Sequence, residues 1–384
     1  MRYNRYVLRP KTPADSDALQ AAENLNAVVP LDDYLYVTGL PFKMTPEVML
    51  NVAYWAQGQG SYQEAEDAIL RAYKLKINDD TVRQVSNYIG GMIFQRDCEL
   101  ANADYQRLNA GKLVFPKSKK RGILYIETDG AALNTRTKDE EGSSWRENKL
   151  GLVFSSDNVY TWTDKHGDRQ SQISKREYVS YIGSVDEFKK HLLSCALKNG
   201  YGLYEQTVLI SDGAAWIRNM RDELFPDAQQ ILDFYHLCEN VNTFAKHYFG
   251  TEESKFRHWA TEVCKLLKDS KWRTVLEMLG KMSKPDQCPV DLQGYIRNNA
   301  MNIDYADYID KGYYIGSGAI ESGNKSVLHQ RLKQAGMRWN VETAQFLLTL
   351  RAKHKSALWD REVVPYVMRR LAPFRYCPYS YVTS

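Results

Sequence analysis

The chain is 384 residues long, 43% of them hydrophobic, and it carries a formal net charge of +4. That length allows two or three domains, and so mild a charge neither requires nor excludes a nucleic-acid partner. The first residues lack the apolar core of a signal peptide, no apolar run approaches the ~18 residues of a membrane span, and the six cysteines form no C-x-x-C pair. We therefore expect a cytoplasmic protein with reduced cysteines, no zinc ribbon and no membrane contact.

The first part of the chain is predicted to be helical after an irregular start. Residues 1–45 are polar and show no clear periodicity, whereas the apolar residues of 46–112 recur at helical spacing. Within that region, Ser61 and Glu64 form a capping box that starts one helix. A turn at 74–79 separates this helix from a second short one.

Two short helices joined by a tight turn are typical of a helix-turn-helix, which contacts DNA through its second helix. The outward positions of that second helix carry side chains that bind bases and phosphates, namely Arg83, Gln84 and Asn87. A plain helical hairpin is the alternative. The basic run at 117–121 is either a solvated linker or a phosphate contact.

Residues 113–236 alternate strand and helix patterns. Strands are predicted near 122–128, 149–155, 176–182, 206–211 and 228–232, and helices at 185–199 and after Asp212. Three strands followed by helix, strand, helix and strand predict an α/β fold, in which a mixed sheet has helices on its faces.

The rest of the chain is predicted to be helical. Residues 237–311 have apolar residues at helical spacing and no convincing strand, so we expect an all-helical insertion. Residues 312–360 then return to the α/β domain with two helices, at 317–335 and 341–358, before a C-terminal tail at 361–384.

Two of the predicted strands end in the same way. Each is an apolar run followed by an aspartate and a small-residue turn, Asp129-Gly130-Ala131 in one strand and Asp212-Gly213-Ala214 in the other. A carboxylate at the end of a buried strand is costly unless it is paired, hydrogen-bonded or bound to a cation. One such aspartate is ordinarily structural, but two on neighbouring strands present paired carboxylates at one sheet edge, where divalent metal ions bind.

A third acid is supplied by Glu321. The Gly-Ser-Gly turn of Gly316–Ser322 opens a helix and places Glu321 near its N-terminus, where the helix dipole favours an acid. Three clustered carboxylates would repel one another, and two Mg²⁺ or Mn²⁺ ions, which prefer oxygen ligands, relieve that conflict. Paired ions of this kind cut and join phosphodiesters. Glu127 shares a strand face with Asp129 and is either an accessory acid or a structural one.

Taken together, these residues resemble bacterial insertion-sequence transposases of the DDE type, specifically the Kra-type branch, with the Lre-type as close relatives. The resemblance covers about residues 60–360. The matching segments are Thr128–Ala131, Trp145–Gly151, Ser211–Ile217, Leu232–His236, Gly312–Ser322 and Arg331–Trp339.

The resemblance implies a ribonuclease H-like catalytic domain whose metal-binding residues are Asp129, Asp212 and Glu321. The related Mutator-like branch carries an all-helical insertion before its last acid, which 237–311 matches. That branch also has a Cys-or-Asp, two residues, then His motif after the second aspartate, and Asp233-Phe234-Tyr235-His236 matches it. His236 is then a catalytic residue that donates to the scissile phosphate or the leaving oxygen. Alternatively, Asp233 and His236 only brace the sheet edge.

The implied function is that of a DNA transposase, which binds terminal inverted repeats through its N-terminal helices, hydrolyses a phosphodiester and transfers the freed strand. Its partners are double-stranded DNA, at the element ends and the target, and further copies of the chain in a homodimer or larger assembly at the bacterial nucleoid. Basic residues on the last helices are candidates for the DNA path: Lys325, Arg331, Lys333 and Arg338. A nuclease of the same fold without strand transfer and a domesticated DNA-binding regulator are the alternatives.

Overall fold

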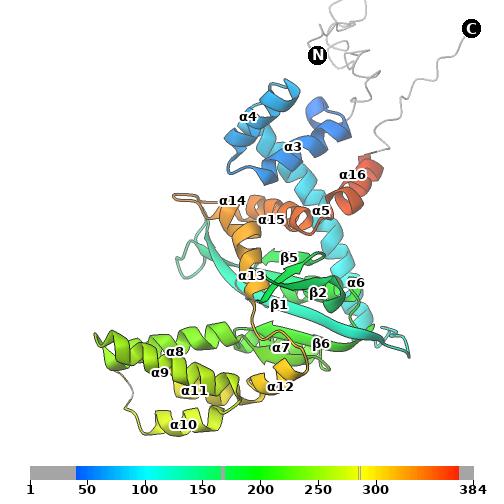
Figure 1. The fold of residues 1–384 in the computed structure, drawn as a ribbon. Helices are drawn as coiled ribbons and strands as arrows, with labels where there is room; N and C mark the ends of the chain where they lie inside the picture. Colours follow the sequence, from blue (N-terminus) through cyan, green and yellow to red (C-terminus); the bar gives the residue numbers. More distant parts are fainter. Residues whose placement is uncertain (1–39, 166–168, 284, 286, 372–384) are drawn as a thin grey trace, which may run out of the picture. The chain divides into compact units, whose positions relative to one another are not determined.

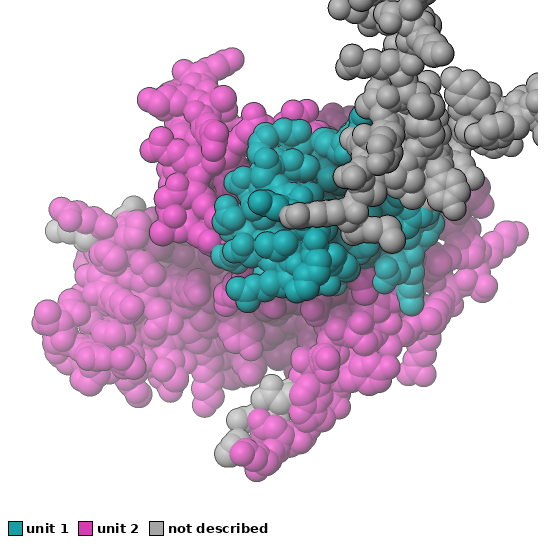
Figure 2. Space-filling model, turned by 90° about the horizontal axis from the view of Figure 1, so that it is seen from above, with its two compact units in different colours: residues 1–93, 358–384 teal, residues 94–357 magenta. Residues whose placement is uncertain are grey.

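The computed structural model describes residues 40–371 apart from 166–168, 284 and 286. The chain divides into two compact units (Figure 2), one formed by 1–93 with 358–384 and the other by 94–357. Most of the predicted irregular start, and residues 372–384 of the predicted tail, lie outside the described residues.

The first unit is helical. Its elements are η1 (Pro41–Lys43), α3 (Pro46–Gly58), α4 (Tyr62–Tyr73), the first part of α5 (Asp79–Asn109), η5 (Trp359–Val363) and α16 (Val364–Leu371) (Figure 1). The predicted start of α4 is confirmed, since the Ser61 hydroxyl accepts from the Glu64 amide at 3.0 Å and the Glu64 carboxylate accepts from the Gly60 amide at 3.1 Å. These bonds use amides that a helix leaves free at its N-terminus.

Two expectations for this unit are wrong. The helix after the turn is not short: α5 runs for 31 residues, because no proline interrupts it and Asn78 caps its start by accepting from Thr81 at 2.8 Å. The last residues are not simply a tail either. Amphipathic α16 buries Val367 and Leu371 and packs against α3, so the described part of 361–384 is helical.

The second unit is built on a five-stranded mixed sheet of order β5-β2-β1-β6-β7. Its strands are β1 (Lys120–Asn134), β2 (Trp145–Ser155), β5 (Glu177–Ile182), β6 (Tyr204–Ser211) and β7 (Gln229–Leu232). The pairs β1–β2 and β2–β5 are antiparallel, and β1–β6 and β6–β7 are parallel. The five predicted strands, the mixed direction and the α/β class are therefore confirmed.

A second, two-stranded sheet was not predicted. Strands β3 (Val159–Thr163) and β4 (Arg169–Ile173) pair antiparallel and form a ribbon. Tyr160 and Trp162 are exposed, with 63% and 48% of their surface accessible. The period-2 burial pattern of a half-buried strand is absent here, because β3 has no buried face.

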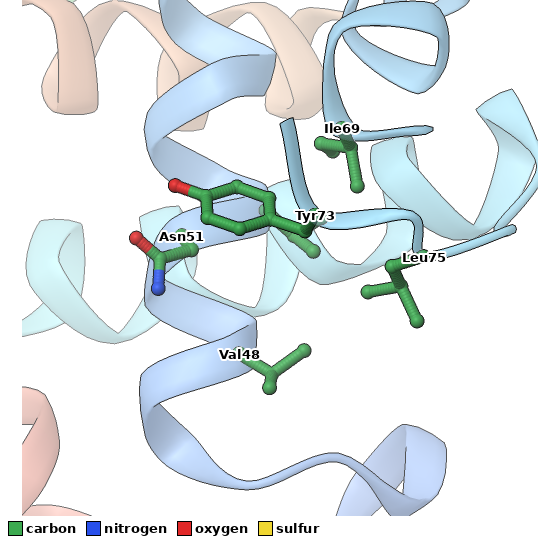
Figure 3. A pocket seen from close by; sticks show the side chains of 6 residues that line it. Val48, Asn51, Ile69, Tyr73 and Leu75 are labelled. Carbon is green, nitrogen blue, oxygen red and sulfur yellow. The ribbon is translucent and has the colours of Figure 1, made fainter. Parts of the chain in front are cut away.

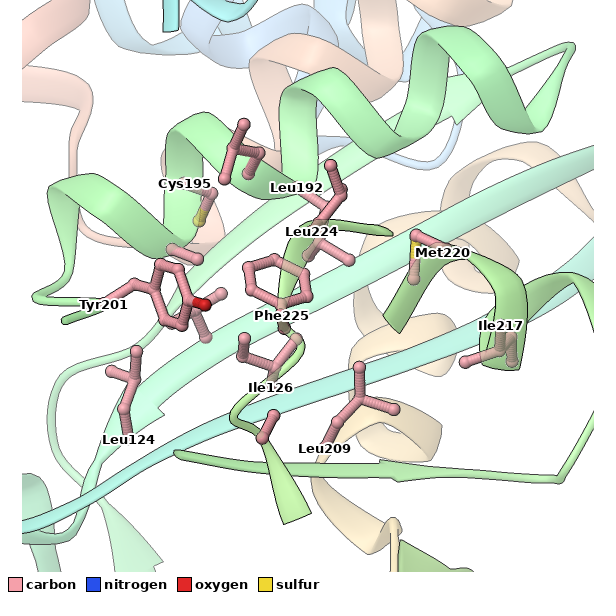
Figure 4. Close-up of a cluster of buried hydrophobic side chains, with 14 of the residues drawn as sticks. Leu124, Ile126, Leu192, Cys195, Tyr201, Leu209, Ile217, Met220, Leu224 and Phe225 are labelled. Carbon is pink, nitrogen blue, oxygen red and sulfur yellow. The ribbon is translucent and has the colours of Figure 1, made fainter. Parts of the chain in front are cut away.

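Helices cover both faces of the main sheet. On one face, α6 (Val185–Lys198) and α7 (Ala215–Leu224) pack on a cluster that includes Leu124, Ile126 and Leu209 (Figure 4). Strand alternation therefore turns Glu127 and Asp129 to the opposite face. That face packs against α15 (Val341–Lys355), whose Gln345 side chain bonds the β5 backbone.

The remaining elements are helical. Those of the insertion are α8 (Phe234–Phe249), α9 (Glu253–Lys268), α10 (Trp272–Gly280), α11 (Leu292–Asn298), η3 (Ala300–Asn302) and α12 (Tyr305–Asp310). The return to the sheet consists of α13 (Gly318–Gly323), the π-helical η4 (Asn324–His329) and α14 (Gln330–Leu332). The described residues of 237–311 contain no strand, as predicted. No helix in the described part of the chain has the length and apolarity needed to cross a membrane.

Candidate active site

The two predicted aspartates lie at the ends of neighbouring parallel strands. In the β1–β6 register Glu127 is opposite Ile210, so two positions further along Asp129 comes level with Asp212, which directly follows β6. Burial, together with the charge of Asp212, raises the pKa of Asp129. The sheet topology therefore places both carboxylates at one edge, as the sequence predicted.

Hydrogen bonds fix the carboxylate of Asp129. Its Oδ1 accepts from the Gly130 amide at 2.8 Å, and its Oδ2 accepts from the side-chain amide of Asn324 at 2.6 Å. Both hydrogen bonds favour the ionised form of Asp129, and so they oppose the rise in its pKa that burial causes. Because each of its oxygens accepts a hydrogen bond, the Asp129 carboxylate is held in one orientation.

The backbone around Asp212 is also held. Its carboxylate accepts from the Ala214 amide at 2.9 Å, and its carbonyl accepts from the Tyr295 hydroxyl at 2.6 Å, which ties the helical insertion to this edge. Gly213 has a φ of +82°, and a Cβ there would lie 2.7 Å from a side-chain carbon of Leu232. Only glycine fits this turn, so the small residue after Asp212 has a structural reason.

Helix α13, which carries Glu321, is attached to β1. The Ile320 amide donates to the Glu127 carboxylate at 2.8 Å, and Asn324 holds Asp129 from the following turn. At Gly323 a Cβ would lie 2.6 Å from the Tyr178 ring, so a glycine there lets the helix approach the sheet closely. The Glu321 side chain is exposed, and its charge acts on Glu127.

Glu127 has the properties of a structural acid. It is 1% exposed, and burial raises its pKa to about 8, with the charges of Asp233 and Glu321 adding to the effect. Its Oε2 accepts the Ile320 amide. The sequence left open whether Glu127 is an accessory acid or a structural one. A neutral, buried Glu127 carboxyl that holds a helix fits the structural role.

Asp233 braces this edge of the sheet. For Asp233, this is the structural role that was the alternative to a catalytic one in the Asp-x-x-His motif. As the N-cap of α8 it accepts from the Tyr235 and His236 amides at 2.8 and 3.4 Å. Its other oxygen accepts from the Ser317 hydroxyl at the start of α13. His236 itself keeps a side chain that is 43% exposed, 3.7 Å from Glu239, and a protonated His236 ring would lower the pKa of Asp129. The histidine is therefore in the vicinity of the paired aspartates.

No metal cage is preformed at this edge. Among the described residues, no group of three or more His, Cys, Asp and Glu side chains is placed to hold a metal ion. The donor chemistry nevertheless suits a hard divalent cation, since the carboxylates of Asp129 and Asp212 on neighbouring strands lie at one edge, where the charge of Asp212 raises the pKa of Asp129. The structure brings Asp129 and Asp212 together and places Glu321 on the attached helix.

The predicted DNA-binding residues differ in accessibility. On the final helices Lys325, Lys333 and Arg338 are exposed. Arg331 is not: it is 1% exposed and lies 5.2 Å from the Trp339 ring centre, so its assignment to a surface DNA path is corrected. A guanidinium stacked on an aromatic face is a packing contact here.

In the helical unit, two of the three predicted DNA contacts are engaged within their own helix. Arg83 and Gln84 both bond the Asp80 carboxylate at 2.6 Å, and Asn87 is partly buried. The same unit has a pocket of about 230 Å³ (Figure 3), lined by Val48, Asn51, Val52, Ile69, Tyr73 and Leu75. Its lining carries no ionisable acid or base except the Tyr73 phenol, so it is not the candidate active site.

Asn324 is the site residue that the sequence reasoning missed. Its position three residues after Glu321, on the same helical stretch, was the available signal, because residues three apart on a helix share a face.

No model of a known protein family matches the chain, and no curated protein matches it.

Proposed function

We propose that this protein is a DNA transposase of an insertion sequence, with a ribonuclease H-like catalytic domain formed by the second unit. The observation that carries the proposal is the placement of Asp129 and Asp212 at the ends of adjacent parallel strands, with the Glu321 helix attached beside them. The order of three antiparallel-paired strands, helix, strand, helix and strand supports the same fold.

In this proposal Asp129, Asp212 and Glu321 hold two Mg²⁺ or Mn²⁺ ions, which when bound supply activation of a water or 3′-hydroxyl and stabilisation of the leaving oxygen. The protein's own residues prepare that site. Gly130 and Asn324 fix the Asp129 carboxylate, while Glu127 and Asp233 fix the helix that carries Glu321.

His236 is proposed to act as a proton donor. His236 lies in the first turn of α8, in the vicinity of the paired aspartates, and has a half-exposed ring. A ring there is able to donate a proton to the scissile phosphate or the leaving oxygen.

Double-stranded DNA is the proposed partner, with a second copy of the chain because two element ends must be joined in one complex. Exposed Lys325, Lys333 and Arg338 are proposed to contact its phosphates, as is the first part of α5. The proposed place of action is the bacterial nucleoid.

A paired-end assay tests this function. The full chain is incubated with Mg²⁺, DNA carrying the element ends and a circular target. We expect both cleaved ends and joined product. Cleavage without joined product would favour a nuclease of the same fold, and DNA binding without any cleavage would favour a regulator.

A further inference from the structure

The helical stretch formed by α13 and the start of η4 is joined to strand β1 at two points with matched spacing. The Ile320 amide bonds Glu127 at 2.8 Å, and the Asn324 side chain bonds Asp129 at 2.6 Å. Four residues of helix advance about 6 Å, and two residues of strand advance about 6.6 Å. The two bonds therefore run side by side, one to a structural acid and the other to a candidate catalytic acid.

The backbone geometry changes at Asn324. Here the α-helical turn of α13 gives way to the π-helix η4, whose first residue is Asn324. A π-helical turn is rare, and such turns frequently occur at functional sites. Asn324 therefore lies at the junction of the two helix types, with its own backbone still in the right-handed helical region.

The Asn324 side chain is enclosed. The residue is 4% exposed, its amide nitrogen donates to Asp129, and its Oδ1 has no hydrogen-bond partner. Because an unpartnered buried amide oxygen has a free-energy cost, packing alone does not account for asparagine at this position.

We infer that Asn324 is a positioning residue for the cation site: its amide holds the Asp129 carboxylate in the orientation that lets it share a cation with Asp212. The inference rests on the proposed function. Residues that orient a ligand without touching the metal typically change metal affinity about 10–100-fold when they are replaced. Asn324 acts through Asp129 in the same way.

Manganese affinity of the full chain, measured by calorimetry or electron paramagnetic resonance without DNA, tests the inference. Asn324→Leu keeps a similar volume but has no donor, and Asn324→Ser is too short to reach Asp129. We expect both to weaken Mn²⁺ binding about 10–100-fold. In cleavage assays the half-saturating Mg²⁺ concentration should rise by a similar factor, with a smaller change in kcat at saturating Mg²⁺.

The matched control is Asn148→Leu, which removes a fully buried asparagine of strand β2 that accepts from the Ser180 hydroxyl and does not bond an aspartate. It should leave Mn²⁺ affinity within about twofold of the parent. If the folded Asn324 variants also bind Mn²⁺ like the parent, the inference is overturned. Asn324→Ser decides the matter if Asn324→Leu does not fold.

Asp129→Asn and Asp212→Asn separate this inference from the proposed function. If both aspartate variants lose Mn²⁺ while the Asn324 variants retain it, only the role of Asn324 is wrong. If the aspartate variants bind Mn²⁺ as well as the parent does, the edge holds no cation and the proposed function fails as well.

Discussion

The side-chain amide of Asn324 donates to the Asp129 carboxylate across 2.6 Å and so joins the last part of the α/β unit to its central strand. Residues almost 200 positions apart in the sequence thereby meet at one sheet edge. The carboxylates there repel each other unless a cation or a proton intervenes.

Asp212→Asn should stabilise the metal-free protein and abolish metal-dependent activity. The asparagine oxygen can still accept from the Ala214 amide, while the loss of charge lowers the pKa of Asp129 from its raised value. We expect a gain on the order of 1 kcal/mol in the free energy of unfolding at pH 7 with a chelator present. Urea denaturation measures it, with exposed Asp227→Asn as the control. A loss of stability would contradict the like-charge account.

Glu127→Gln should change how stability depends on pH. The folded-state pKa of Glu127 is raised from 4.5 to about 8, so between these values the folded chain binds more protons than the unfolded chain. The parent should therefore lose stability as the pH rises from about 5 to about 9.

Glutamine has the same shape, accepts the Ile320 amide and has no charge. At pH 9, in chelator, Glu127→Gln should be more stable than the parent by about 2–4 kcal/mol, and near pH 5 the two should be alike. Denaturation at both pH values provides the comparison, with exposed Glu205→Gln as the control. Equal stability of parent and variant at pH 9 would show that Glu127 is not buried as a neutral acid.

Ser317→Ala should destabilise the second unit more than Ser322→Ala does. Ser317 is 8% exposed and donates to Asp233, whereas Ser322 of the same helix is exposed. Loss of a buried hydrogen bond to a charged group costs about 1–3 kcal/mol, and Ser322→Ala should cost much less. Urea denaturation compares the two. Equal effects would mean that the Ser317–Asp233 bond does not hold α13.

Alanine variants of Arg331 and Lys333 should differ in their effects: the first should lower stability, and the second should weaken DNA binding. Arg331→Ala removes a fully buried side chain stacked on Trp339 and should destabilise the protein by about 3 kcal/mol or more. Exposed Lys333→Ala should leave stability unchanged and lower the slope of log affinity for DNA against log salt by about 0.9. Fluorescence anisotropy over a salt series measures the slope. An unchanged slope would remove Lys333 from the DNA path.

The strands of the main sheet were predictable because each buries an apolar run, and the two aspartates were predictable because they end such runs. Exposed β3 lacks that pattern, so the ribbon that it forms with β4 was not predictable, and α16 has little local signal apart from its amphipathic spacing. Arg331 was placed on the surface because a sequence does not reveal that Trp339 folds back over it. Asn324 was missed because its contact depends on the approach of α13 and η4 to β1, which arises from tertiary packing.

The most direct test of the account is Mg²⁺-dependent strand cleavage and joining by the parent, Asp129→Asn, Asp212→Asn and Glu321→Gln, each shown to be folded. We expect the parent to cleave and join only when Mg²⁺ is present, and all three variants to fall to background while exposed Asp227→Asn remains active. Cleavage by the Asp129 and Asp212 variants at the parent's rate would contradict it.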